Sequence, residues 1–161
     1  RIEFAFTPRE ELGPQGLESG QILIETNTGE GLKPLVKVAS GGELSRILLA
    51  LKSVLAEADD VYVGVFDEVD TGVGGAVADI VGSKLAQLAQ HRQVIAITHL
   101  AQIASQATHH LNVSKTTHEG RTRTSVTTLT AEERIDEVAR MLGGVEITDK
   151  TRAHAAELLA R

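Results

Sequence analysis

Two acidic residues follow a short apolar run near the middle of the chain. Asp67 and Glu68 come directly after residues 61–66 (VYVGVF), whose length and β-branched content predict a buried strand. At the tip of such a strand, the Asp67 carboxylate can hold Mg²⁺, directly or through a bound water, and Glu68 can orient or deprotonate an attacking water. Asp is also common in turns, so the pair alone allows a purely structural interpretation as well.

A second motif, Ser40-Gly41-Gly42-Glu43, precedes residues whose apolar positions recur at helical spacing. Ser40 and Glu43 form the S-x-x-E pattern of a capping box, which predicts that a helix begins here. Two glycines at a helix start leave backbone N–H groups uncovered, and the helix dipole makes this end attractive to anions. The motif therefore suits the terminal phosphate of a nucleotide, and a simple capping box is an equally good interpretation of the motif by itself.

Two further polar residues extend this set. His99 follows Thr98 at the end of a second predicted strand, 94–97 (VIAI), where an imidazole can hydrogen-bond a terminal phosphate or the attacking water. Asp70 lies two residues after Glu68 and could brace a loop across an interface. A lone His is more often structural and an Asp in a turn needs no function, so each residue is ambiguous when it is taken alone.

A parallel sheet would bring these residues together. A helix predicted over 77–88 separates the two strands, and a helix over 44–55 precedes them. This order implies right-handed crossovers and parallel strands. Ligands of such sheets bind beyond the carboxyl ends of the strands. Asp67, Glu68 and His99 are therefore expected to lie at one edge of the sheet.

The flanking regions are predicted from apolar alternation, Gly and Pro. Strands are expected over 1–6 and 21–27, with loops over 8–20 and 28–34. After the second central strand, a short helix is expected near 100–106, then strands over 111–114 and 122–129 around a turn at Glu119-Gly120. Two helices, near 131–142 and 148–160, are expected on either side of Gly143-Gly144.

Composition limits the function classes only broadly. The chain has no Cys, which excludes a disulfide scaffold and thiolate metal sites and fits a reducing cytoplasm. No stretch approaches the roughly 20 apolar residues of a membrane span. The formal net charge of -6 means that any DNA contact must be local or made by other regions of the protein. Candidate local contacts are Lys115, Arg121 and Arg123 around the predicted turn and Arg134, Arg140, Lys150 and Arg152 on the last helices, although solvated surface charge is the commoner explanation.

The order of the four motifs resembles the signature, Walker B, D-loop and switch histidine of ABC ATPases. Transporter subunits of that class usually carry a Pro after the Walker B pair, whereas Glu68-Val69-Asp70 resembles the SMC-type ATPases. Longer stretches are similar to the RecN family of bacterial DNA repair proteins. These stretches are 38–52 (VASGGELSRILLALK), 65–75 (VFDEVDTGVGG), 98–104 (THLAQIA), 113–115 (VSK) and 139–144 (ARMLGG).

The resemblance implies an architecture. Residues 1–161 would be the C-terminal lobe of an ABC/SMC-type P-loop NTPase head, an α/β fold with a mainly parallel sheet flanked by helices. The N-terminal P-loop lobe and the coiled coil would lie outside this chain, which contains no G-x-x-x-x-G-K-[ST]. The chain alone is therefore expected to be inactive, and the intact head is expected to bind and hydrolyse ATP.

The resemblance also divides the motif residues between two ATP molecules. The residues serving ATP and Mg²⁺ on the N-terminal lobe of the same molecule would be Asp67, at the metal, with Glu68 and His99. The residues meeting the γ-phosphate on a second head would be Ser40, Gly41, Gly42 and Glu43, with Asp70 near the same interface. ATP would thus drive homodimerisation of the heads.

The biological setting follows from the same resemblance. RecN-like proteins act in double-strand break repair and recombination, in the bacterial cytoplasm and in association with the nucleoid, with DNA as a partner and no membrane. Two alternatives stay open at this point. One is a non-catalytic dimerisation module, and the other is an ABC transporter-type ATPase subunit.

Overall fold

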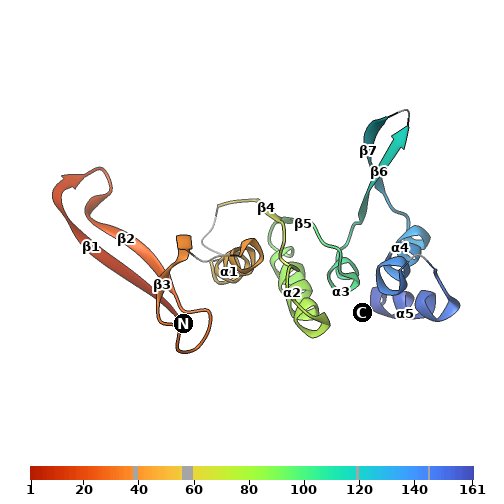
Figure 1. Ribbon diagram of the computed structural model, residues 1–161, viewed down its shortest axis with the longest axis horizontal. Coiled ribbons are helices and arrows are strands. Elements are labelled where there is room, and N and C mark those ends of the chain that lie inside the picture. Colours follow the sequence, from red (N-terminus) through yellow and green to blue (C-terminus); the bar gives the residue numbers. More distant parts are fainter. Residues whose placement is uncertain (38–39, 56–59, 119, 145) are drawn as a thin grey trace.

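The computed structural model describes residues 1–37, 40–55, 60–118, 120–144 and 146–161. The molecule is elongated, with an N-terminal hairpin at one end and two helices at the other (Figure 1). Within the described residues the strands form three separate sheets, ordered β1-β2-β3, β4-β5 and β6-β7. The motifs singled out above belong to the central part, around β4 and β5.

The central part alternates helices and strands. Its elements are α1 (Gly41–Val54), β4 (Val63–Phe66), α2 (Gly75–Leu88), β5 (Gln93–Ala96) and α3 (Ala101–Ala104). β4 and β5 are parallel, in register from Val63 opposite Gln93 to Phe66 opposite Ala96. The pairing continues past the strands, where the Ile97 N–H donates to the Phe66 carbonyl at 2.9 Å. The predicted parallel pairing is confirmed for these two strands, and the other two sheets are antiparallel.

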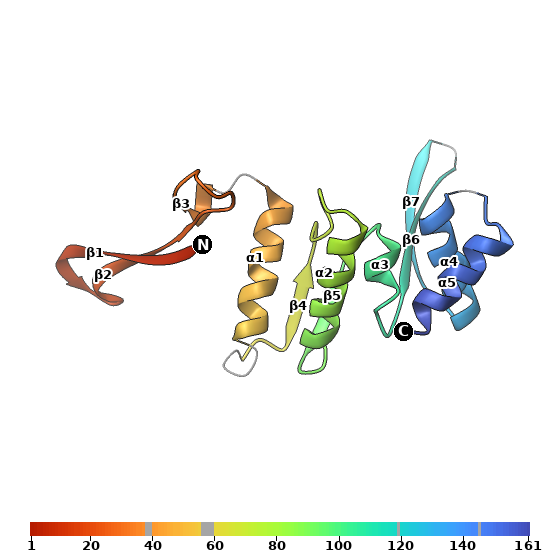
Figure 2. The same ribbon diagram turned by 90° about the horizontal axis from the view of Figure 1, so that it is seen from below.

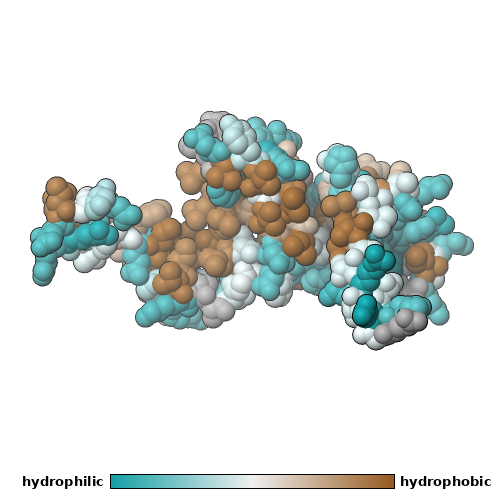
Figure 3. All heavy atoms as spheres, turned by 90° about the horizontal axis from the view of Figure 1, so that it is seen from above, coloured by the Kyte–Doolittle hydropathy of each residue, from teal (hydrophilic) through white to brown (hydrophobic). Residues whose placement is uncertain are grey.

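The helices cover one face of the β4–β5 pair (Figure 2). Phe66 points to that side and is 3% exposed, within a core that α2 supplies with Ala78, Val81 and Leu85. Successive strand residues point to opposite faces. The other face therefore carries four apolar side chains that stay 43–59% exposed: Val63, Val65, Ile95 and Ile97. Figure 3 looks onto this side, where apolar surface gathers over the middle of the molecule.

Helix α1 buries less of its apolar stripe than its periodicity predicts. Leu49 is 4% exposed and joins the core, whereas Leu44 and Leu48 are 46% and 44% exposed. Val54 and Leu55 at the end of the helix are exposed as well. The reason is that α1 packs on one side only, against α2 and the turn after β4.

The N-terminal part is a long hairpin, followed by β3 (Lys33–Pro34) and a short 3-10 helix (Leu35–Lys37). β1 (Ile2–Gly13) and β2 (Gly16–Ile24) pair through most of the segment that was expected to be a loop, so that prediction was wrong. Pro8 is paired with Glu18, and it is accommodated because β1 is an edge strand of its sheet, where a residue without an N–H is tolerated.

The C-terminal part contains a second hairpin and two packed helices. β6 (Leu111–His118) extends further than predicted, and β7 (Arg121–Thr128) lies one residue earlier than predicted. Glu119 of the expected turn lies outside the described residues. Helices α4 (Ala131–Gly143) and α5 (Asp149–Leu159) begin after the capping residues Thr130 and Thr148. Together with α3 they bury a second apolar core, composed of Ala101, Val138, Ala139, Ala155 and Leu158. Among the helices described, none has the length and apolar character needed to cross a bilayer.

Candidate functional site

The acidic pair lies in a sharp turn at the end of β4. Asp67 Oδ1 accepts from the Glu68 N–H at 2.8 Å, and the Thr71 N–H donates to the Glu68 carbonyl at 3.0 Å. Glu68 has a φ of 60°, a left-handed conformation that non-glycine residues rarely adopt. Val69 is fully buried and anchors the turn, while Asp67 and Glu68 are exposed. Both carboxylates therefore stand at the strand end, where the sequence predicts them.

Helix α1 holds this turn through an arginine that sequence reasoning missed. Arg46 Nη1 donates to the carbonyls of Val69 at 3.2 Å and Thr71 at 2.9 Å. The available signal was helical spacing: Arg46 lies four residues after Gly42 and three before Leu49, both buried, so the three share one face of α1. The start of α1 and the turn after β4 thus form one rigid unit.

The two glycines of the signature motif occupy different surroundings. A Cβ on Gly42 would lie 2.8 Å from the Glu68 carbonyl oxygen and 3.0 Å from Thr71 Cβ, so a larger residue would displace the turn. Gly42 is buried, whereas Gly41 is exposed. Of the two glycines expected to meet a phosphate, Gly41 therefore lies at the surface, whereas Gly42 is covered by the turn. Gly42 is covered because α1 packs closely against the turn after β4, and only glycine, which has no Cβ, permits that approach.

The Glu68 carboxylate lies over the start of α1. A Cβ on Gly41 would collide with Glu68 Oε2, whereas the N-cap Ser40 accepts from the Glu43 N–H at 3.5 Å. A carboxylate is favoured at this position because the helix dipole presents positive potential at its N-terminus. The structure thus brings Glu68 and Gly41 together within one lobe, although the resemblance assigns them to different nucleotides.

Asp70 connects the ends of the two central strands. Its carboxylate is buried, and its Oδ2 accepts from Thr98 Oγ1 at 2.6 Å and from the His99 N–H at 2.9 Å. His99 Nδ1 lies 2.9 Å from the same oxygen. The carboxylate is therefore engaged by residues of its own chain. The location of Asp70 near a dimer interface stays a prediction.

This contact determines which ring nitrogen carries the proton when the His99 ring is neutral. Burial raises the pKa of Asp70, but the hydrogen bonds from Thr98 and His99 and the nearby His99 ring outweigh burial and hold the pKa below its usual 3.8. Asp70 is therefore a carboxylate at neutral pH and can only accept, so Nδ1 of His99 must donate. A neutral His99 ring then presents Nε2 as an acceptor, and its side chain is 75% exposed.

Asp67 has the chemistry of a magnesium ligand. One of its oxygens accepts the Glu68 N–H, and the second is left for a cation at the exposed strand end. Over the described ranges, no three His, Cys, Asp or Glu side chains converge to make an all-protein metal site. Mg²⁺ is commonly bound by one or two carboxylates together with phosphates and water, so a single Asp fits that arrangement.

Comparison with curated proteins finds extensive sequence similarity. The DNA repair protein RecN of Bacillus subtilis is 50% identical over 149 residues, which is 92% of this chain. RecN of Deinococcus radiodurans is 49% identical over 160 residues, which is 99% of this chain. The chain spans only about a quarter of these relatives, 26% and 28% of their lengths. No family model matches the chain.

Solved structures of SMC heads share the fold. The Smc head domain with a coiled coil and joint from Pyrococcus yayanosii matches 85% of this chain and 25% of its own, with a TM-score of 0.55 and 20% identity. The Smc head with an extended coiled coil bound to the C-terminal domain of ScpA, from Pyrococcus furiosus, matches 86% of this chain and 34% of its own, with a TM-score of 0.52 and 20% identity. At this identity the likeness establishes the fold alone.

Proposed function

The chain belongs to the RecN family, of whose curated members it spans about a quarter, and we propose that it forms the C-terminal lobe of an ATP-hydrolysing head that acts in DNA double-strand break repair and recombination. The observation that carries the ATPase proposal is the Asp70 bridge, which holds His99 beside the strand end that bears Asp67 and Glu68. Similarity to repair proteins favours this function over a transporter subunit. The ordered acid and imidazole groups favour it over a non-catalytic module.

Each side chain of the strand ends has a distinct role in the proposed reaction. Asp67 would hold Mg²⁺, which neutralises phosphate charge when it is bound with ATP. Glu68 would take a proton from the attacking water. His99 Nε2 would accept a hydrogen bond from that water or, with both ring nitrogens protonated, donate one to the γ-phosphate. Asp70 acts through His99 and is a positioning residue, because its carboxylate is buried beneath the histidine.

The start of α1 would serve the ATP of a second head. Ser40, Gly41 and Glu43 lie there, and the N–H groups of a helix start attract phosphate. The Glu68 carboxylate now lies over Gly41, and two anions cannot share that position. Binding of the second head's phosphate therefore requires Glu68 to turn toward its own nucleotide. Gly42 contributes by letting α1 approach the turn.

The uncovered apolar face of β4 and β5 supports docking of a P-loop lobe. Val63, Val65, Ile95 and Ile97 form a continuous set on this face, and soluble monomers rarely leave large apolar patches in water. Leu44 and Leu48 on α1 are exposed as well. A second lobe that covers these side chains would also deliver the phosphate-binding loop that this sequence lacks.

We expect ATP turnover to require both lobes. The chain alone should show no hydrolysis, and co-expression with the P-loop lobe of the same protein should produce it, measured as phosphate release. A co-expressed pair carrying Asp67→Asn is the control, since it retains both lobes and removes one carboxylate charge at the proposed metal. Hydrolysis by the chain alone, or an inert pair of correctly folded lobes, would contradict the proposal.

Asp70→Asn in the assembled head should lower kcat by about 10–100-fold, by analogy with the loss of a carboxylate that orients a metal-bound histidine. ATP affinity should change little, because Asp70 is buried away from solvent. Asp136→Asn is a matched control, since Asp136 lies on α4, is half-exposed and pairs with Arg152 of α5. Steady-state kinetics and nucleotide titration separate the two effects, and an unchanged kcat would exclude the positioning role.

The same variant should reveal a pH-dependent stability difference. Because the folded-state pKa of Asp70 lies below the usual 3.8, its ionised form stabilises the fold at pH values above that figure. This contribution is lost as pH falls through the lower folded-state pKa. The difference in urea midpoint between wild type and Asp70→Asn should therefore be full near neutrality and shrink below pH 3.8.

A further inference from the structure

The candidate basic residues of the C-terminal part fall into two groups. Three of those on α4 and α5 are already engaged within the chain. Arg134 donates to the Ala107 and Thr108 carbonyls at 2.6 and 3.3 Å. Arg140 binds Glu137 through two bonds of 2.8 and 2.6 Å, and Arg152 lies 3.0 Å from Asp136. These cations stabilise the helix pair and its junction with α3, so they are poorly placed to bind a ligand.

The β6–β7 hairpin carries the second group. Opposed residues share a face, and the register pairs His118 with Arg121 and Thr116 with Arg123. These four side chains, with Ser114 and Ser125, form what we call the basic face, and Lys115 lies on the opposite face with Val113 and Val126. Within the described part of the chain, Lys115, Arg121 and Arg123 form no ion pair.

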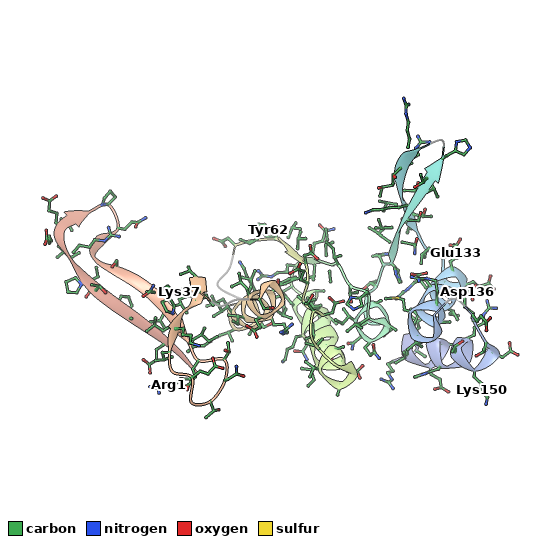
Figure 4. All side chains as sticks on the ribbon, in the orientation of Figure 1. Arg1, Lys37, Tyr62, Glu133, Asp136 and Lys150 are labelled. Carbon is green, nitrogen blue, oxygen red and sulfur yellow. The ribbon has the colours of Figure 1, made fainter. Side chains whose placement is uncertain are left out.

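The strands of this hairpin carry only positive charges, whereas the chain as a whole has a formal net charge of -6. Neither β6 nor β7 contains an Asp or Glu, and Glu119 between them lies outside the described residues. Nearly every residue of the two strands is exposed. The ribbon projects from the body of the molecule, beyond α3 and α4 (Figures 1 and 4). Its cations are therefore accessible to a large ligand.

The side-chain chemistry selects phosphate as that ligand. Arg groups and the hydroxyls of Thr116, Ser114 and Ser125 donate hydrogen bonds of the kind that phosphate oxygens accept. β6 and β7 contain no Phe, Tyr or Trp, the side chains on which unpaired bases stack most strongly. A two-stranded ribbon also has the width of the DNA major groove, where cations on both faces can reach the flanking phosphates.

We propose that the β6–β7 hairpin binds duplex DNA through the phosphate backbone, with Arg121 and Arg123 on one face and Lys115 on the other. This inference depends on the proposed role at DNA and is independent of ATP hydrolysis. Contacts of this kind carry little sequence information, so the hairpin should strengthen binding to unrelated duplexes equally. An acidic protein partner would need the same cations but not duplex geometry.

The test uses the intact protein that contains this chain. A triple variant, Lys115→Ala with Arg121→Ala and Arg123→Ala, is compared with Arg9→Ala, Lys37→Ala and Arg161→Ala together. The control removes the same charge from exposed residues outside β6 and β7; Lys37, for example, ends the short helix after β3 (Figure 4). Affinity for two unrelated duplexes and for single-stranded DNA is measured by fluorescence anisotropy over a salt series.

Log affinity falls as log salt concentration rises, and loss of three phosphate contacts should make this slope shallower by about 2–3 for both duplexes. The control should keep the wild-type slope. Arg121→Lys with Arg123→Lys should also keep it, which separates charge from folding. An unchanged slope in the triple variant, an equal fall in the control, or a change confined to single-stranded DNA would overturn the inference. ATP turnover without DNA should be unchanged in all of these charge variants. The ATPase proposal is tested separately by Glu68→Gln, so failure of one proposal can be distinguished from failure of the other.

Discussion

In the assembled head, Glu68→Gln is expected to lower ATP turnover by about 10²–10⁴-fold, the usual effect of losing a positioned general base. The amide has nearly the shape of the carboxylate but cannot accept the proton of the attacking water. Glu68 is exposed and its side chain lies over Gly41, so the replacement should leave the core intact. Removing the negative charge also removes repulsion between Glu68 and the phosphate that we propose binds beside Gly41.

The same change should therefore trap a dimer. With hydrolysis slowed and ATP still bound, two heads should stay associated, which light scattering or sedimentation with ATP can detect. Glu157→Gln is the matched control, because Glu157 is exposed on α5, far along the chain from the site, and should leave both turnover and association at wild-type values. Undiminished turnover in Glu68→Gln would exclude Glu68 as the base.

The parallel pair and the location of its acids could be predicted because each depends on local sequence. An apolar strand followed by Asp67 and Glu68, and another followed by Thr98 and His99, place these residues at one edge once a helix connects the strands. No knowledge of side-chain packing is needed for this step. The residue types at the candidate site could therefore be predicted from the sequence without knowing their contacts.

The contacts that hold the site together could not be predicted in the same way. The bond from Arg46 to the turn and the Asp70 bridge to His99 join residues 23 to 29 positions apart. Such contacts depend on how α1 and the two strand ends pack, which periodicity does not specify. The burial of Gly42 has the same origin, since a glycine at a helix start is compatible with either an open or a covered position.

The wrong loop prediction and the partial exposure of α1 also have their origin in long-range packing. Pro8 and the glycines near it are strong loop signals, yet β1 pairs with β2 because β1 is an edge strand, where Pro8 leaves no partner strand without a donor. On α1, periodicity identifies Leu44 and Leu48 as apolar positions but does not say which partner covers them. Both side chains stay exposed in this lobe.

Ser40→Arg is expected to abolish ATP-dependent head dimerisation and the hydrolysis that depends on it, while ATP binding by each head is retained. Ser40 caps α1 beside the exposed Gly41, at the place where we propose the γ-phosphate of the second head binds. An arginine there fills that space and removes the hydroxyl donor. ATP binding to the head's own P-loop lobe should be unaffected, because it depends on Asp67 and the ends of β4 and β5 and not on Ser40.

Ser40→Ala distinguishes loss of the cap from obstruction of the interface. It removes the hydroxyl that accepts from the Glu43 N–H, which should cost about 1 kcal/mol of stability, but it adds no bulk. Both variants should therefore melt at similar temperatures, and only Ser40→Arg should lose the dimer completely. Light scattering with ATP and nucleotide titration measure the two properties in parallel. If Ser40→Arg dimerises like the wild type, the start of α1 does not meet the second head's phosphate, because an arginine and a phosphate-bearing partner cannot occupy that space together.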